Sequence, residues 1–303
     1  MSIASPSHGI VCALWTPLKD SGEIDYPLLD RHLEFLKSAG LTGIMALGST
    51  GRFLNLPPAQ REELLVHILR QTSPLPVIAN VSDLDFGVIK RLGAVAREHG
   101  AAGVSVLPTW YFEQSQSDLI EWFVAGGKAA GLPLWLYNFR ECTRNHIEIN
   151  TVREVWERVE VGGFKQSGAQ QDFITELAAL AQQKPFSVFA GADDRIAESL
   201  KLGAVGCISG LANSLPDVMV KVYDAAKAGD VSSAAAGLEL LRSVVRRCHL
   251  VPFPWNQAAI IEARGLNPGV LPDLMSRVTR AHYAQLKRET LALFIEFGLP
   301  RVS

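Results

Sequence analysis

Short apolar runs alternate with amphipathic helical stretches along most of this chain, and this alternation limits its possible folds more than any other feature. The eight runs read GIVCALW, GIMALG, LPVIANV, GVSVLP, LPLWLYN, VGGFKQ, FSVFAG and VGCISG. Residues 26–40, 57–71 and 86–100 are examples of the helical stretches between them. Strands that alternate with helices of ten or more residues are typical of βαβ units and a parallel sheet. Eight such units within residues 9–210 predict an α/β fold, the (β/α)8 or TIM barrel.

Glycines recur at the ends of the expected helices. Gly40, Gly100, Gly131 and Gly203 each follow an expected helix. A glycine just past a helix end takes the left-handed conformation and turns the chain toward the next strand. The recurrence therefore supports a repeated strand–helix unit.

We expect residues 9–230 to form the barrel and residues 231–303 to form a C-terminal helical extension. Residues 215–230 are predicted to be the eighth barrel helix, followed by helices at 231–250, at 254–265 and from about Leu271. No low-complexity linker separates these parts, so residues 1–303 are expected to form a single unit.

Composition excludes several classes of partner. The 303 residues carry a formal net charge of −2, which gives no basic field for nucleic acid or for an anionic membrane. No apolar run is long enough to span a bilayer, and the N-terminus lacks a basic start before an apolar stretch, so a cytoplasmic location is expected. The four cysteines lie far apart without a CxxC pair, which favours neither a zinc ribbon nor a disulfide scaffold.

Candidate functional residues are sought where the barrel strands end, because (β/α)8 barrels place their chemistry at the carboxyl ends of the strands. The polar and aromatic residues that meet this condition are Ser49, Thr50, Trp110, Tyr111, Tyr137, Asn138, Lys165, Asp193 and Asp194.

Lys165 is the most informative of them, since it is the only one of ten lysines within an expected strand. A buried ammonium is costly, whereas a desolvated neutral amine is a good nucleophile toward carbonyls. Tyr137, one strand away, has the reach to be its hydroxyl partner, although an inward tyrosine by itself more often packs a core. The alternative is that the strand ends two residues earlier and Lys165 is a solvated loop residue.

The GSTG turn offers the hydroxyls of Ser49 and Thr50 together with several backbone N–H groups, an arrangement that suits a carboxylate. The alternative is a simple turn between strand and helix. None of the seven histidines lies at an expected strand end, and a pair such as Asp193 and Asp194 at a helix start is typical of an N-cap. We therefore expect neither a metal nor another cofactor. The two acids also disfavour a phosphate site.

The segments ALWTPLKDSGEID, GSTG, YN, GFK and AGADD with LGAVGCISGLAN together resemble the pyruvate-dependent class I aldolases typified by dihydrodipicolinate synthase and N-acetylneuraminate lyase. The resemblance runs from about Gly9 to Lys227. It implies that Lys165 forms a Schiff base with a 2-oxo acid and that Tyr137 moves protons above it. It also implies that the hydroxyl pair of Ser49 and Thr50 binds the substrate carboxylate and joins the proton relay.

Further residues follow from the same resemblance. Tyr111 is similar to the tyrosine that members of the family lend to a neighbouring subunit. Gly191 and Ile208 correspond to positions that line the site near the keto acid. The family is usually a homotetramer, a dimer of dimers, so this state is the expectation for the chain.

The chain departs from the family pattern around the second substrate. Arg52 stands where a glutamate is common, and Phe139 and Arg140 follow the tyrosine–asparagine pair where a proline is usual. A gapless alignment places Cys142 at the family's arginine for the second substrate's carboxylate, whereas two inserted residues place Arg144 there. Arg140 or Arg144 is then expected to bind a carboxylate or hydroxyl at the far end of the substrate. The alternative is that each arginine is a surface loop residue.

The resulting expectation is a Schiff-base lyase that acts on pyruvate or another 2-oxo acid and cleaves or forms a C–C bond. Alternatives with the same chemistry are a dehydratase or deaminase of a sugar-acid or hydroxyproline-derived 2-oxo acid, and an authentic 4-hydroxy-tetrahydrodipicolinate synthase. An alternative of another class is a non-catalytic barrel that binds a 2-oxo acid.

Overall fold

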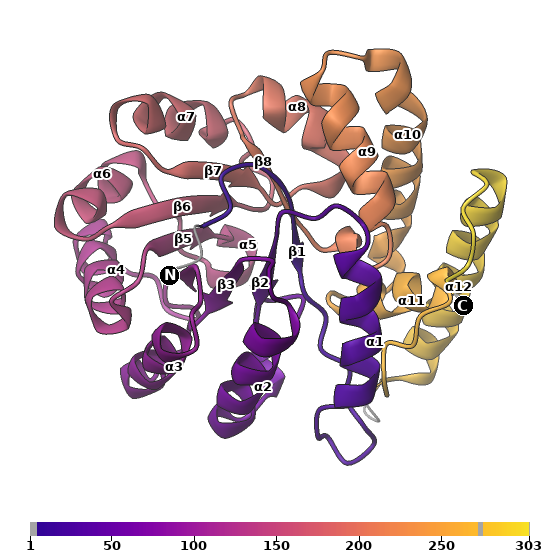
Figure 1. The fold of residues 1–303 in the computed structure, drawn as a ribbon, viewed down its shortest axis with the longest axis horizontal. Helices are drawn as coiled ribbons and strands as arrows, with labels where there is room; N and C mark the ends of the chain where they lie inside the picture. The colour runs from indigo at the N-terminus through magenta and orange to yellow at the C-terminus, as the bar shows by residue number, and fades with distance from the viewer. Residues whose placement is uncertain (1–4, 272–274, 303) are drawn as a thin grey trace.

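A computed structural model describes residues 5–271 and 275–302 and shows eight parallel strands in a closed barrel (Figure 1). Each strand pairs with the next along the chain, and the last pairs with the first, with Gly9 opposite Gly206. This confirms the predicted α/β barrel. The strands are β1 (Gly9–Ala13), β2 (Gly43–Ala46), β3 (Val77–Asn80), β4 (Gly103–Val106), β5 (Leu134–Asn138), β6 (Val161–Gln166), β7 (Ser187–Ala190) and β8 (Gly206–Ser209).

Helices surround the strands. The four predicted glycine caps have φ between +62° and +103°, which confirms the left-handed turns that end those helices. The α-helices are α1 (Tyr26–Lys37), α2 (Pro58–Gln71), α3 (Phe86–Glu98), α4 (Gln116–Ala130), α5 (Arg140–Thr143), α6 (Ile149–Arg158), α7 (Phe173–Gln183), α8 (Ile196–Lys201), α9 (Pro216–Lys227), α10 (Val231–Arg247), α11 (Trp255–Arg264) and α12 (Arg277–Glu296). The 3₁₀ turns are η1 (Phe53–Asn55), η2 (Asp193–Arg195), η3 (Leu211–Asn213) and η4 (Cys248–Leu250).

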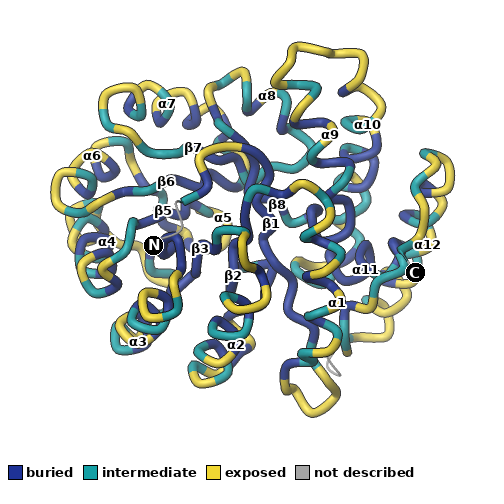
Figure 2. Tube along the Cα trace, viewed as in Figure 1, coloured by how far each residue is buried: buried dark blue, intermediate teal, exposed yellow. Residues whose placement is uncertain are grey.

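The strand residues are almost all buried (Figure 2). This is expected of a barrel whose interior is filled by side chains and whose outer face is covered by helices. Trp135 is the bulkiest of the interior side chains, and it packs against Phe189 with ring centroids 5.5 Å apart. A Cβ atom at Gly163 would lie 2.4 Å from the Trp135 ring, and one at Gly162 would lie 3.1 Å from its Nε1. The glycine pair of β6 therefore makes room for an indole. The interior cluster consists of Val11, Ala13, Met45, Ile78, Trp135, Phe189 and Ile208.

Three helices, α10 to α12, gather on one side of the barrel (Figure 1). Helix α10 packs on α9, and α11 packs on both α12 and η3 at the end of β8. The final helix was predicted to begin at about Leu271, and this is wrong, because its helical residues begin at Arg277. The Ser276 side chain accepts a hydrogen bond from Thr279 N at 3.0 Å and thereby sets the start of the helix.

Candidate active site

Lys165 lies inside β6, and its side chain is buried with only 5% of the residue exposed. The alternative of a solvated loop lysine is therefore wrong. Its Nζ lies 4.0 Å from Met45 Sδ and 4.3 Å from the centroid of the Tyr137 ring. Within residues 5–271 and 275–302 no carboxylate lies within ion-pair distance of Nζ. The strand thus holds an amine, unpaired with any acid, inside the barrel.

Tyr137 lies directly opposite Lys165 in the pairing of β5 with β6. Its side chain is buried, and its ring stacks on Phe139 with centroids 6.1 Å apart and planes at 21°. The amine of Lys165 faces the ring, while the hydroxyl makes no hydrogen bond to any residue that the structure describes. The hydroxyl is therefore available to a ligand.

Asn138 follows Tyr137 and points to the opposite face of the sheet. Its Nδ2 donates to Gln166 Oε1 at 2.9 Å and lies 3.1 Å from His146 Nδ1, and its Oδ1 accepts from Ile147 N at 3.2 Å. These contacts fix the end of β5 and the loop that follows it. The sequence analysis assigned no role to Asn138, although alternation along a strand separates the two faces.

The turn after β2 carries Ser49 and Thr50. Leu47 leads into it with φ of 58°, and its carbonyl oxygen accepts a hydrogen bond from Asn80 Nδ2 at 2.7 Å. Across the described ranges, the hydroxyls and backbone N–H groups of Ser49 and Thr50 donate to no acceptor. A Cβ at Gly51 would lie 2.8 Å from Leu14 O, so only glycine fits there. The turn presents two hydroxyls and two free amides at the mouth of the barrel.

The two aspartates after β7 were predicted to cap a helix, and this is wrong, since neither side chain caps η2 or α8. Asp193 Oδ2 instead accepts from Leu211 N at 3.3 Å, and Oδ1 lies 3.8 Å from Cys207 Sγ. Burial raises the pKa of Asp193 to about 6, while a hydrogen bond from Ser209 and the charge of Lys165 oppose this rise. Asp193 thus ties the loops after β7 and β8 together.

A pocket of about 280 Å³ adjoins the turn after β2. Ser49, Arg52, Trp110 and Cys142 are among its lining residues. Arg140 and Arg144 are exposed and do not line it. The short helix α5 explains the difference, because it ends at Thr143 with Arg144 in the left-handed conformation (φ 66°). The loop therefore brings the cysteine, and neither arginine, to this pocket.

The remaining predicted residues, Ile208, Gly191 and Tyr111, do not line this pocket. Ile208 belongs to the interior cluster with Met45. Gly191 follows β7 and donates its N–H to Gln166 O at 2.7 Å, and a Cβ there would lie 2.0 Å from Ser167 Oγ. Tyr111 is 71% exposed, has φ of 82°, and its ring contacts that of the likewise exposed Phe112 at 4.8 Å between centroids. Within one chain, the fold does not bring Tyr111 to Lys165.

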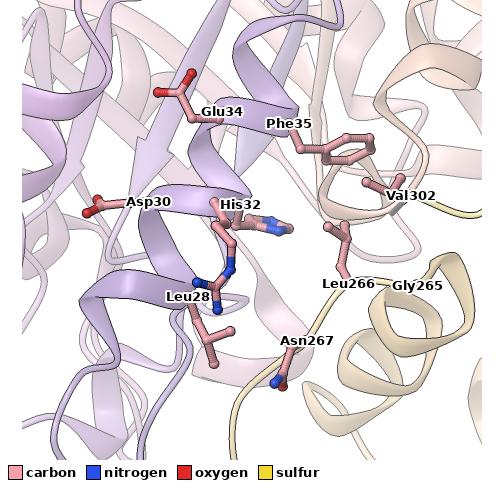
Figure 3. Close-up of a pocket in the computed structure, with 10 residues that line it drawn as sticks. Leu28, Asp30, His32, Glu34, Phe35, Gly265, Leu266, Asn267 and Val302 are labelled. Atoms are coloured by element: carbon pink, nitrogen blue, oxygen red, sulfur yellow. The ribbon is translucent and has the colours of Figure 1, made fainter.

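A second and larger pocket, of about 570 Å³, lies between α1 and the segment that follows α11. Figure 3 shows His32 and Phe35 of α1 facing Leu266 and Val302 across it. It contains none of the predicted site residues. Among the described residues, no three His, Cys, Asp or Glu side chains gather closely enough to hold a metal ion. Over the same part of the chain, no helix has the length and apolarity needed to cross a membrane.

Comparison with known proteins places this barrel in a family. The sequence model of the dihydrodipicolinate synthetase family matches residues 6–291. The 4-hydroxy-tetrahydrodipicolinate synthase of Haloarcula marismortui is 27% identical over 285 residues, which cover 94% of this chain and 93% of that protein. The enzyme of the same name from Limosilactobacillus fermentum is 31% identical over 261 residues, 85% of this chain and 83% of that one.

A solved structure agrees with the sequence matches. YagE, a prophage protein from E. coli K12 that belongs to the dihydrodipicolinic acid synthase family, was solved in complex with pyruvate. It superposes with a TM-score of 0.88 at 25% identity, covering 97% of this chain and all (100%) of that one. The chain therefore belongs to the dihydrodipicolinate synthetase family and is a lyase of the Schiff-base class that this family represents.

Proposed function

We propose that Lys165 is the amine that forms the Schiff base and that the substrate is pyruvate or another 2-oxo acid. The observation that carries this proposal is the position of Nζ, which is buried, lies against the Tyr137 ring and has no described carboxylate within ion-pair distance. An unprotonated lysine amine in such a pocket is a nucleophile toward carbonyl carbons. Nζ attacks C2 of the ketone, water leaves, and the protonated imine withdraws electrons from the adjacent carbon.

The carboxylate of the 2-oxo acid binds at the turn after β2. Ser49 and Thr50 offer unpartnered backbone N–H groups and hydroxyls there. Hydrogen bonds to a carboxylate are shorter and about twice as strong as those between neutral groups. Met45, whose Sδ lies 4.0 Å from Nζ, belongs to the same apolar cluster as Ile208, and Gly191 lacks the Cβ that would collide with Ser167 Oγ.

Protons are moved by Tyr137 together with Ser49; the Tyr137 hydroxyl bonds to none of the described residues. We further propose that Tyr111 reaches the site of a neighbouring copy. The support is its exposure and its outward, positive-φ backbone at the end of the β4 loop. The active form is then at least a dimer, and a homotetramer by similarity to the family.

The second substrate or leaving group is chosen elsewhere in the site. Relatives named 4-hydroxy-tetrahydrodipicolinate synthase support C–C bond formation. Cys142, which a gapless alignment places at the family's arginine, lines the pocket beside Ser49, and this favours a different second substrate. Dehydration or deamination of a sugar-acid or hydroxyproline-derived 2-oxo acid is the second candidate. Turnover across a panel of 2-oxo acids separates them.

Reductive trapping tests the proposal. Borohydride added with pyruvate is expected to leave one adduct per chain, mapped by peptide mass spectrometry to Lys165. Lys165→Met removes the amine, and Lys165→Arg replaces it with a group that stays protonated, so neither variant should trap pyruvate. An unmodified wild-type mass, or an adduct mapped to another lysine, contradicts the assignment.

We also propose the reducing cytoplasm as the compartment. All four cysteines are free, and Cys142 is exposed at the pocket. An exposed thiol beside an active site persists best where thiols are kept reduced. Fractionation of the source cells tests this. We expect the activity in the cell extract after membranes are removed, and activity in the secreted fraction would contradict the proposal.

A further inference from the structure

Three arginines are buried within the described residues, and one of them lacks an acid. Arg61 pairs with Asp83, and Arg264 pairs with Asp217 at 2.7 Å. Arg52 is equally buried, at 3% exposure, yet no Asp or Glu that the structure describes pairs with it. A buried guanidinium is costly without an anion. Its partner in the working enzyme is therefore to be sought outside the chain.

The contacts of Arg52 leave most of its donors unused. One terminal nitrogen donates to Thr16 O, although a guanidinium has five N–H groups. Nε is buried and has no partner. The guanidinium carbon lies 4.6 Å from the Trp15 ring centroid and 5.0 Å from that of Trp255. The two indoles hold the planar group in place, which preorganises it for a planar anion.

Arg52 also borders the substrate side of the molecule. It lines the 280 Å³ pocket together with Ser49, and it lines a second pocket of about 200 Å³ together with Asn55 and Trp255. Ser49 belongs to the proposed carboxylate-binding turn, only three positions earlier in the chain. Because burial lowers the pKa of Arg52 only to about 10, the group carries a full charge at neutral pH.

We propose that Arg52 binds an anionic group at the far end of the substrate, so that the preferred substrate class is a 2-oxo acid with a second, distal carboxylate. This inference rests on the proposed imine chemistry. It replaces Arg140 and Arg144, which are exposed, in the role of distal-group ligand. The distal carboxylate enters beside Ser49 and takes the unused donors of Arg52.

Matched pairs of 2-oxo acids test the inference without knowledge of the natural substrate. The pairs are 2-oxoglutarate with 2-oxopentanoate and 2-oxoadipate with 2-oxohexanoate, and pyruvate is the common reference. The half-saturating concentration for imine formation is read from the fraction of chain trapped by cyanoborohydride. In at least one pair, we expect the half-saturating concentration of the dicarboxylate for the wild-type protein to be at least roughly tenfold lower than that of the monocarboxylate. A charge-assisted hydrogen bond contributes enough binding free energy for a difference of this size.

Variants assign the effect to the residue. Arg52→Gln should remove the preference for the dicarboxylate and leave trapping of pyruvate and of the monocarboxylates within about twofold. Arg52→Lys should keep part of the preference, since it retains the charge without the fork of donors. Arg144→Gln, the same substitution at an exposed arginine of the neighbouring loop, should change nothing.

The outcomes distinguish failure of the Arg52 inference from failure of the proposed imine chemistry. Equal saturation by both members of each pair in the wild-type protein overturns the inference, whether or not the variants fold. An equal loss for all acids in Arg52→Gln also overturns it and makes Arg52 a structural clamp on α11. If the wild-type protein traps no 2-oxo acid at all, the proposed function fails and the inference falls with it.

Discussion

Tyr137 shows how one residue serves both the fold and the proposed reaction. Its ring is buried between Phe139 and the amine of Lys165, so its apolar part contributes to the core. Its hydroxyl, in contrast, has no hydrogen-bond partner among the described residues. A buried tyrosine usually finds a partner for its hydroxyl. The missing partner is accounted for if substrate or a bound water supplies it.

Tyr137→Phe therefore separates catalysis from stability. We expect kcat to fall roughly 10²- to 10⁴-fold, the range for loss of a general acid–base group. The melting temperature should stay nearly constant, because the substitution removes no hydrogen bond to a residue that the structure describes. Steady-state kinetics and calorimetry measure the two effects. Unchanged kcat removes Tyr137 from the proton relay.

Asp193 predicts a pH dependence of stability. Its folded pKa of about 6 lies above its ordinary value of 3.8, so the fold favours the protonated carboxyl. The stability that this group contributes is fully present below about pH 3.8 and is lost as the pH rises through about 6. Asp193→Asn stays neutral at every pH. The melting temperature of the variant minus that of the wild type should therefore be larger at about pH 8 than at about pH 4; a constant difference contradicts this.

At the scale of the elements, the strands could be predicted correctly from the sequence. All eight runs became strands, and β6 spans the predicted VGGFKQ residue for residue. Lys165 and Tyr137 could be found because barrel topology dictates which strand ends meet. The start of α12 was misplaced because the Ser276 cap, not the end of the preceding apolar residues, decides it.

Other parts of the site could not be predicted from the pattern. Helix α5 has four residues, too few for helical periodicity to show, so the choice between Cys142 and Arg144 had to wait for the structure. The sequence showed that Arg52 replaces a glutamate that is common in the family. Its burial without an acid depends on Trp255, which lies about 200 positions further along the chain.

Two glycines test the packing of these elements. Gly163→Ala places a methyl group 2.4 Å from the Trp135 ring, and overpacking of this kind costs about 1–3 kcal/mol of unfolding free energy. Gly126→Ala in α4 is the matched control, because its new Cβ meets Val106 at an ordinary 3.5 Å. The control should be neutral or stabilising by up to about 1 kcal/mol. Urea unfolding of both variants checks this, and equal effects would contradict the packing argument.

For the whole molecule, the core supports one folding unit. The main cluster joins barrel residues such as Leu29 with Leu240 of α10 and Phe294 of α12. A second cluster packs Trp15 at the end of β1 against α11 and α12. We therefore propose that the barrel at 9–230 and the extension at 231–303 unfold together, as one calorimetric transition. Two separated transitions would contradict this.

The exposure of Tyr111 leads to a prediction about assembly. If each site combines Lys165 of one chain with Tyr111 of its partner, a mixed dimer of Lys165→Met and Tyr111→Phe chains contains one intact site. Co-refolding of the two variants should then restore activity well above that of either parent. The activity should follow the mixed-dimer fraction measured by native mass spectrometry. No recovery in confirmed mixed dimers contradicts a site shared between the two chains.

The central claim is that the amine of Lys165 bonds covalently to a 2-oxo acid held by the turn after β2. A crystal soaked in pyruvate tests it most directly. We expect continuous electron density from Nζ to C2 of the ligand, with the ligand carboxylate on the N–H groups of Ser49 and Thr50. Pyruvate bound elsewhere, or separated from Nζ by a gap in the density at full occupancy, would contradict the account.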